Sequence, residues 1–207
     1  MDITGRKLFV KALQEEGVDT IFGYPGGTVT DLFDELYKQD EIEIVLPRHE
    51  QGLLHEAEGY AKSTGKVGVC LVTSGPGATN IMTGLADAHY DNIPLVCFTG
   101  QVPLNLIGND AFQEVDIVGM TRSITKYGVT VRDRKDLGKI IKMAFHIAST
   151  GKPGPCRFPA ALRRRRTSYR VWALQMQAFR CRRPGPCPAL CPLWPQALLR
   201  LLILFLS

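Results

Sequence analysis

Residues 66–100, KVGVCLVTSGPGATNIMTGLADAHYDNIPLVCFTG, contain two apolar runs separated by a segment with a helical pattern. The runs at 66–74 and 93–100 are short and almost continuously apolar, as in strands that are buried on both faces. Residues 77–91 between them have the pattern of a helix. Because parallel strands are joined by crossover connections that are usually helical, this stretch predicts a strand–helix–strand unit of a parallel sheet.

The same alternation of helical and strand patterns extends from residue 4 to about residue 150. Further helices are predicted at 5–17 and 29–39, from Glu50 onward, and at 136–149. Further strands are predicted within 18–27 and at 42–47 and 126–131. This order is typical of the α/β class, in which a parallel sheet carries helices on both faces.

Glu50 lies in the first turn of the helix predicted after RHEQG. The apolar face of that helix is set by residues three and four apart: Leu53, Leu54, Ala57, Tyr60 and Ala61. A carboxylate at a helix start is stabilised by free backbone N–H groups and the helix dipole, which is one explanation for Glu50. A zinc-protease helix is excluded, because that motif needs a second His where Leu53 stands.

Two glycine-rich loops follow predicted strands. GYPGG (residues 23–27) follows the first strand and SGPGATN (residues 74–80) follows the third. Each permits a tight turn whose backbone N–H groups can meet a polar or anionic ligand, although neither has the spacing of a dinucleotide or phosphate loop. Ligands of parallel sheets bind at the carboxyl ends of the strands, so these loops and Glu50 together define a candidate site.

Charge and cysteines both divide the chain near Pro155. Fifteen Lys and Arg and all twenty acidic residues precede this point, whereas ten Arg and no acid follow it. The net charge of +5 therefore reflects the C-terminal segment and does not indicate a nucleic-acid-binding domain. Cys70 and Cys97 lie in apolar runs, where a small buried thiol is expected. We expect a cytoplasmic protein without a disulfide framework, a secretory signal or a membrane anchor.

Six motifs occur in one order along the chain: FGYPGG, RHEQG, GYAKSTGKVGVCLVTSGPGATN, TGLADA, IPLVCFTGQV and GNDAFQEVDIVGMTRSITKY. In order and spacing they resemble the N-terminal, pyrimidine-binding domain of the acetolactate synthase large subunit, a thiamine-diphosphate-dependent enzyme. The resemblance covers residues 4 to about 155. It implies a carboligase that condenses pyruvate with a second pyruvate or with 2-ketobutyrate, in branched-chain amino-acid biosynthesis.

The resemblance gives Glu50 a catalytic role. The matching acid of the family hydrogen-bonds a ring nitrogen of the aminopyrimidine and favours the imino tautomer that removes the thiazolium proton. Gly26 and Gly27 match the turn that lets the backbone approach the cofactor ring. Phe112 and Gln113 match residues near the reacting substrate, and Gln113 is therefore also expected to act in catalysis.

Lys152 matches a position where the family usually has Arg against FAD, so a weaker contact with FAD is implied. The four His residues of the chain are expected to be surface or capping residues, and no metal ligand is predicted. The resemblance implies Mg²⁺ and FAD for the intact enzyme only. It also implies a homodimer of large subunits and a regulatory small subunit as partners.

The chain departs from the family pattern after Gly154. The Gly-Asp-Gly motif of the magnesium and diphosphate domain is missing, and PCRFPAALRRRR replaces an apolar strand that ends in Asp, an apolar residue, Pro and Lys. We therefore expect a domain at 1–155 that lacks its last strand, and a disordered, unrelated segment at 156–207. Read one base later with permitted codons, residues 153–159 can spell Pro-Val-Leu-Val-Asp-Phe-Pro, so a frame error is one hypothesis for this segment.

Three alternative functions remain open from the sequence. One is a related thiamine-diphosphate oxidase, decarboxylase or transferase, against which AFQEVDIVG argues. Another is a non-catalytic domain that pairs with intact large chains. A third, nucleic-acid binding through the Arg run, has no motif to support it. We expect the 207-residue chain to be inactive by itself.

Overall fold

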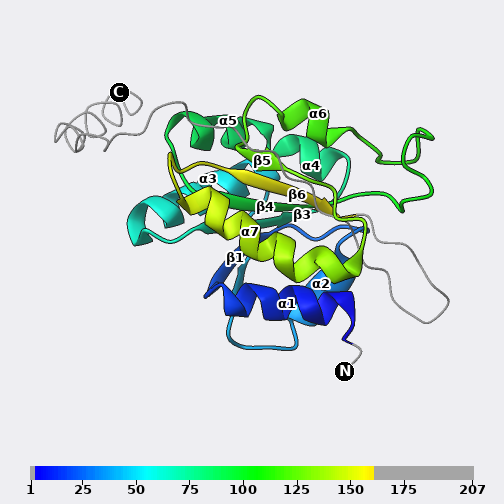
Figure 1. Ribbon diagram of the computed structural model, residues 1–207, viewed down its shortest axis with the longest axis horizontal. Coiled ribbons are helices and arrows are strands. Elements are labelled where there is room, and N and C mark those ends of the chain that lie inside the picture. The colour runs from blue at the N-terminus through cyan, green and yellow to red at the C-terminus, as the bar shows by residue number, and fades with distance from the viewer. Residues whose placement is uncertain (1–2, 161–207) are drawn as a thin grey trace.

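The computed structural model describes residues 3–160, with side chains as far as Arg157, and arranges them around one parallel sheet (Figure 1). The six strands are β1 (Thr20–Gly23), β2 (Glu43–Val45), β3 (Gly68–Val72), β4 (Leu95–Gly100), β5 (Tyr127–Gly128) and β6 (Cys156–Ala160). Their order in the sheet is β2-β1-β3-β4-β6-β5, and every neighbouring pair is parallel. The predicted α/β class is confirmed.

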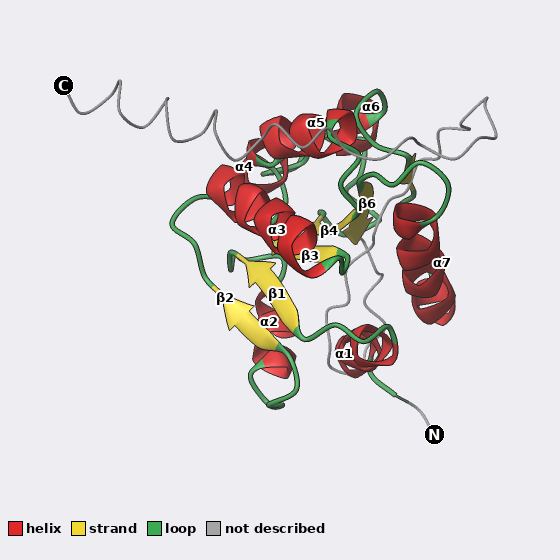
Figure 2. Ribbon diagram, turned by 90° about the vertical axis from the view of Figure 1, so that its left-hand side faces the viewer, coloured by secondary structure: helices red, strands yellow, loops and turns green. Residues whose placement is uncertain are grey.

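The connections between the strands are helical. The helices are α1 (Gly5–Glu15), α2 (Thr30–Leu36), α3 (Glu50–Thr64), α4 (Pro76–Asn80), α5 (Met82–Tyr90), α6 (Ile117–Thr121) and α7 (Leu137–Ser149), with a 3-10 turn, η1 (Arg134–Asp136), before α7. Helices lie on both faces of the sheet, with α1 and α7 on one side and α3 and α5 on the other (Figure 2). Within residues 3–160, no helix combines the length and the hydropathy needed to cross a bilayer.

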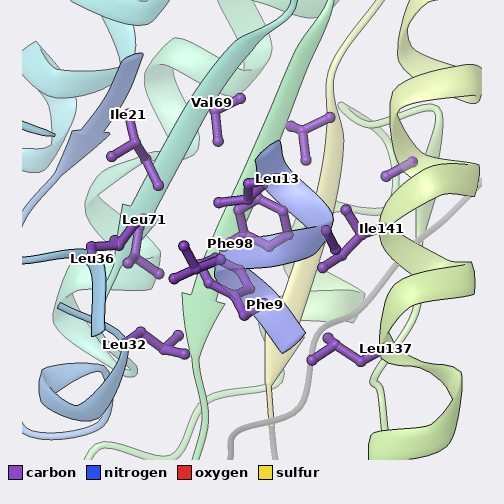
Figure 3. Close-up of a cluster of buried hydrophobic side chains, with 14 of the residues drawn as sticks. Phe9, Leu13, Ile21, Leu32, Leu36, Val69, Leu71, Phe98, Leu137 and Ile141 are labelled. Atoms are coloured by element: carbon purple, nitrogen blue, oxygen red, sulfur yellow. The ribbon is translucent and has the colours of Figure 1, made fainter. Parts of the chain in front are cut away.

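The first face of the sheet packs against α1, α2 and α7. Its buried cluster includes Phe9 and Leu13 from α1, Ile141 from α7, and Leu71 and Phe98 from the sheet (Figure 3). The rings of Phe9 and Phe98 meet edge to face with centroids 4.9 Å apart, an arrangement that aromatic pairs favour. This cluster anchors the two long amphipathic helices to the centre of the sheet.

The second face of the sheet packs against α3 and α5. Leu53 and Leu54 of α3 are fully buried there, as the spacing of apolar residues predicted. Cys70 of β3 and Cys97 of β4 stand opposite each other in the register of the two strands and belong to the same cluster. Both are free, buried thiols, as expected. Burial raises the pKa of the Cys70 thiol well above its usual value. The central strands are therefore buried on both faces, which explains their continuous hydrophobicity.

The single helix predicted at 77–91 is wrong, because the structure divides it into α4 and α5 at Ile81. The ψ angle of Ile81 is −2°, about 40° from the α-helical value. Ile81 itself is fully buried, so the change of direction is held by packing. The break leaves Asn80 at the end of a short helix close to the carboxyl edge of the sheet.

The expectation that the sheet lacks its last strand is also wrong. Cys156–Ala160 forms β6, which pairs with β4 on one side and with β5 on the other, so it is an interior strand. Pairing uses backbone N–H and C=O groups, which this segment supplies in spite of its unusual side chains, except for the N–H that Pro159 lacks. Cys156 is buried against the first face. Disorder was expected for the whole of residues 156–207. Residues 156–160 form β6 instead, and residues 161–207 lie outside the described residues.

Arg157 is the unusual side chain of β6, since it is only 1% exposed. Its Nη1 donates to the Ile117 carbonyl and to Thr121 Oγ1 (2.9 Å), and its Nη2 donates to Thr99 Oγ1 (3.0 Å). These acceptors are all neutral, and the buried Nε has no hydrogen-bond partner. Burial lowers the pKa of Arg157 to about 9. A guanidinium thus occupies a position of the sheet that offers no carboxylate as a hydrogen-bond partner.

Candidate functional site

The candidate site lies at the carboxyl edge of the sheet. The loop after β1 contains Gly26 and Gly27, the turn after β3 contains Gly75 and leads into α4 with Gly77 in its first turn, and α3, which follows β2, begins at Glu50. All three segments leave the sheet at the same edge because the strands are parallel. The topology therefore brings the two glycine-rich segments and Glu50 to one edge of the sheet, as the sequence predicted.

Glu50 is held at the start of α3 and is only 9% exposed. His49 caps the helix by accepting a hydrogen bond at Nδ1 from the Gln51 amide (3.1 Å), which confirms the capping role expected for a histidine. The Asn80 side-chain amide donates to Glu50 Oε2 (2.9 Å). The other oxygen, Oε1, faces Gly77, where an added Cβ would lie 3.2 Å away. One carboxylate oxygen is thus fixed by an amide, and the other borders a position without a side chain.

Thr73 joins the two glycine loops. A Cβ added to Gly26 would lie 2.5 Å from the Cβ of Thr73, and one added to Gly77 would lie 2.8 Å from its methyl group. The hydroxyl groups of Thr28 and Thr73 are hydrogen-bonded at 2.9 Å, and Thr28 Oγ1 also accepts from the Ser74 amide (3.0 Å). Both loops therefore need glycine because they close onto the same threonine.

Gln113 lies directly against the second glycine loop. A Cβ on Gly75 would be 2.7 Å from the Cβ of Gln113, and Gly75 has a φ of +57°, a conformation that L side chains rarely adopt. Gln113 has a φ of +60° although it is not glycine. Such a conformation is unfavourable and persists where the surroundings fix it, often at functional sites. The structure thus brings Gln113 to the loop that also faces Glu50.

Phe112, beside Gln113, projects away from the domain and is 88% exposed. The loop that carries both residues is closed by Glu114, whose carboxylate accepts from the amides of Gly108 and Ala111, the latter at 2.9 Å. These backbone hydrogen bonds lower the pKa of Glu114. The loop therefore presents a large apolar side chain next to the candidate site.

Gly27 and Lys152 differ in their relation to this site. Gly27 is exposed, and an added Cβ would meet no atom within 4 Å, so its backbone is open to a ligand. Lys152 precedes β6 and so lies at the amino edge of the sheet, where its positive charge contributes to lowering the pKa of His89 after the larger effect of burial. The structure brings Glu50, Gly26, Gly27, Phe112 and Gln113 to one edge and leaves Lys152 at the other.

Sequence reasoning did not assign roles to Asn80, Thr28 and Thr73. Asn80 is the last residue of SGPGATN, a motif that was noted for its glycines. The sequence therefore placed Asn80 near the candidate site but did not predict its contact with Glu50. The Thr28–Thr73 hydrogen bond joins residues 45 positions apart, and no local pattern indicates such a pair. The buried Ser74 hydroxyl, which has no hydrogen-bond partner, was also not foreseen.

Residues 3–120 match the family described as thiamine pyrophosphate enzyme, N-terminal TPP binding domain. This match covers more than half of the chain, and the parallel sheet with its glycine loops agrees with it. The chain therefore belongs to the thiamine-pyrophosphate-dependent enzyme family.

The relatives give a narrower likeness. The chain is 55% identical over 152 residues to the acetolactate synthase large subunit of Lactococcus lactis, an alignment that covers 73% of this chain and 26% of that protein. It is 53% identical over 153 residues to the mitochondrial acetolactate synthase catalytic subunit of Saccharomyces cerevisiae, covering 74% and 22%. It is 54% identical over 151 residues to the chloroplastic acetolactate synthase of Arabidopsis thaliana, covering 73% and 22%. The chain thus spans about a quarter of the length of the curated relatives it matches.

Proposed function

We propose that this chain supplies the pyrimidine-binding half of a thiamine-diphosphate site in an acetolactate synthase large subunit. The observation that carries the proposal is the position of Glu50, which is almost buried, held by Asn80 and flanked by Gly77 at the edge where both glycine loops converge. The acetolactate synthase names of the relatives support the narrower assignment.

The residues at this edge fit a flat, polar ring. When bound, thiamine diphosphate supplies the carbanion chemistry that joins two 2-keto acids. Glu50 would share a proton with a ring nitrogen of the cofactor in a hydrogen bond, while Asn80 fixes the orientation of the Glu50 carboxylate. Gly27 leaves its backbone open to a ligand, and the missing side chain of Gly77 lets this segment approach Thr73 and Glu50 closely.

Leu54, buried beneath the first turns of α3, limits the access of water to Glu50 from the protein side. A carboxylate that exchanges a proton with a bound group works best when its position is fixed and water is excluded. Gln113 and Phe112 face the substrate, pyruvate or 2-ketobutyrate, with the Gln113 amide as a hydrogen-bond donor and the Phe112 ring as an apolar wall.

The rest of the family enzyme would complete this site. The proposal includes Mg²⁺ and FAD, a second large subunit across the active site, and a regulatory small subunit. The open side of the site, where Gly27 and Phe112 are exposed, is consistent with a partner domain there. An FAD contact at Lys152 would lie at the opposite edge of the sheet and so would not share the Glu50 site. A cytoplasmic location, suggested by the cysteine usage, also belongs to the proposal, and cell fractionation tests it.

The experiment grafts residues 1–155 of this chain, which include the part that resembles the family, onto the remainder of the Lactococcus lactis large subunit, a relative 55% identical over 152 residues. In this hybrid, Glu50→Gln should lower kcat by about 10²–10⁴-fold with thiamine diphosphate saturating, the usual contribution of a positioned acid–base group. Glu56→Gln is the matched control, because Glu56 lies on the same helix and is exposed. An active hybrid whose kcat is unchanged by Glu50→Gln would refute the proposed role.

A further inference from the structure

A second cluster of polar side chains lies between α3 and α5, outside the site described above. His55 and Glu58 are one turn apart on α3, and Asp87 reaches them from α5, which packs against α3. His55 Nδ1 is 2.8 Å from Glu58 Oε2 and 3.6 Å from Asp87 Oδ2. One ligand atom of each residue lies within 4.8 Å of the others. An imidazole and two carboxylates therefore converge on one point between two helices.

Glu58 sets this cluster apart from an ordinary group of surface charges. Its side chain is only 4% exposed, and its Oε1 is buried without a hydrogen-bond partner. A buried carboxylate oxygen without a donor costs free energy, because it has lost its hydration and gained nothing in return. Its other oxygen, Oε2, is hydrogen-bonded to His55 Nδ1, and a second carboxylate, Asp87, lies 3.6 Å from the same nitrogen. The nearby Lys62 does not fill this role, since its ammonium group is bonded to Asp91 at 2.9 Å.

We propose that His55, Glu58 and Asp87 bind a divalent transition-metal ion, with Zn²⁺ as the best fit. Zn²⁺ is bound by imidazole nitrogen and carboxylate oxygen at about 2.0–2.2 Å, so two of its tetrahedral ligands lie roughly 3.3 Å apart. The 2.8 Å and 3.6 Å separations bracket that value. Mg²⁺ and Ca²⁺ prefer oxygen ligands alone and fit an imidazole less well.

The exposure of the cluster agrees with a three-ligand site. The side chains of His55 and Asp87 are 39% and 50% exposed, so an ion can enter from solvent and keep a water molecule as its fourth ligand. Glu58 provides the buried side of the site. A metal bound here joins α3 to α5, and so it stabilises the helix whose first residue is Glu50.

The test measures Zn²⁺ binding by the untagged, metal-free full chain. Three cysteines beyond residue 160 would bind zinc themselves, so the measurements use a background with Cys181→Ser, Cys187→Ser and Cys191→Ser. Competition with a chromophoric chelator gives the affinity, and mass spectrometry under native conditions gives the stoichiometry. We expect one Zn²⁺ per chain and a rise in Tm with zinc, because an ion that binds only the folded state stabilises it.

Substitutions then locate the ion. Asp87→Asn keeps the shape of an exposed side chain. Both it and His55→Ala should weaken Zn²⁺ binding at least about tenfold, since even the loss of a residue that only hydrogen-bonds a metal ligand has an effect of that size. His89→Ala, on α5 but outside the cluster, should leave the affinity unchanged. Circular dichroism checks that each variant is folded. The proposal is overturned if the folded parent chain binds no zinc, or if a folded Asp87→Asn chain binds it as tightly as the parent does.

Discussion

Replacing Arg157 by methionine should stabilise the domain. The guanidinium of Arg157 is fully buried between β6 and α6, and its hydrogen-bond partners are all neutral. Burial lowers its pKa from the usual value of an arginine to about 9. At about 1.4 kcal/mol per pH unit, this corresponds to roughly 5 kcal/mol against folding at neutral pH. Methionine has a similar length and no charge, and exchanging buried charges for apolar residues often gains about 1–4 kcal/mol.

Part of that gain is offset by the hydroxyl groups left behind. Thr121 Oγ1 keeps a hydrogen bond by donating to the Ile117 carbonyl (2.7 Å), whereas Thr99 Oγ1 loses the donor that Arg157 Nη2 provides. We therefore expect Arg157→Met to raise the free energy of unfolding by about 1–4 kcal/mol at pH 7. Arg132→Met removes an exposed guanidinium and should change it by less than about 0.5 kcal/mol.

Urea unfolding of the full chain, followed by far-ultraviolet circular dichroism, measures both effects. The pH dependence provides a second check. Since the pKa of Arg157 is lower in the folded state than in the unfolded state, the cost of burying its charge is complete below about pH 9 and decreases as the pH rises further. The advantage of Arg157→Met should therefore be smaller at pH 10 than at pH 7. A variant that is less stable than the parent at pH 7 would refute the reasoning, because Arg157 would then contribute favourably.

Three further outcomes are expected. Gly75→Ala should lower the free energy of unfolding by about 1–3 kcal/mol in the same urea assay, because its Cβ would overlap Gln113 and its φ is positive. As the pH falls from 4 towards 2, the parent should lose stability relative to an Asp19→Asn variant, because hydrogen bonds from Lys66 and Tyr60 lower the pKa of Asp19 to about 2. Acid titrations of the two chains, run in parallel, measure this, and stability curves that did not converge over this range would contradict it. The purified 207-residue chain should form no acetolactate from pyruvate in a colorimetric assay, and any formation that depends on thiamine diphosphate would contradict this.

The sequence predicted most of the sheet because its central strands are buried on both faces and carry continuous apolar runs. It also predicted that Glu50 and the glycine loops share one edge, since parallel strands carry their loops to the same side. It did not predict β6, because Arg157 and Pro159 interrupt the apolar pattern while the backbone still pairs. The break between α4 and α5 was missed because Ile81 is apolar and fits the helical spacing of its neighbours, so the sequence pattern shows no interruption there.

The place of β6 in the sheet also decides when the fold can close. β6 lies between β4 and β5, yet it is the last of the three in the chain. The residues from β5 to the end of β6 take roughly 2–7 s to synthesise at typical translation rates. During that time the open edge of β4 has no partner from β6, and the pairing that holds β5 in the sheet cannot form. A growing chain therefore exposes a pairing edge at a central, fully buried strand until residue 160 is available, and such an open edge favours aggregation during this interval.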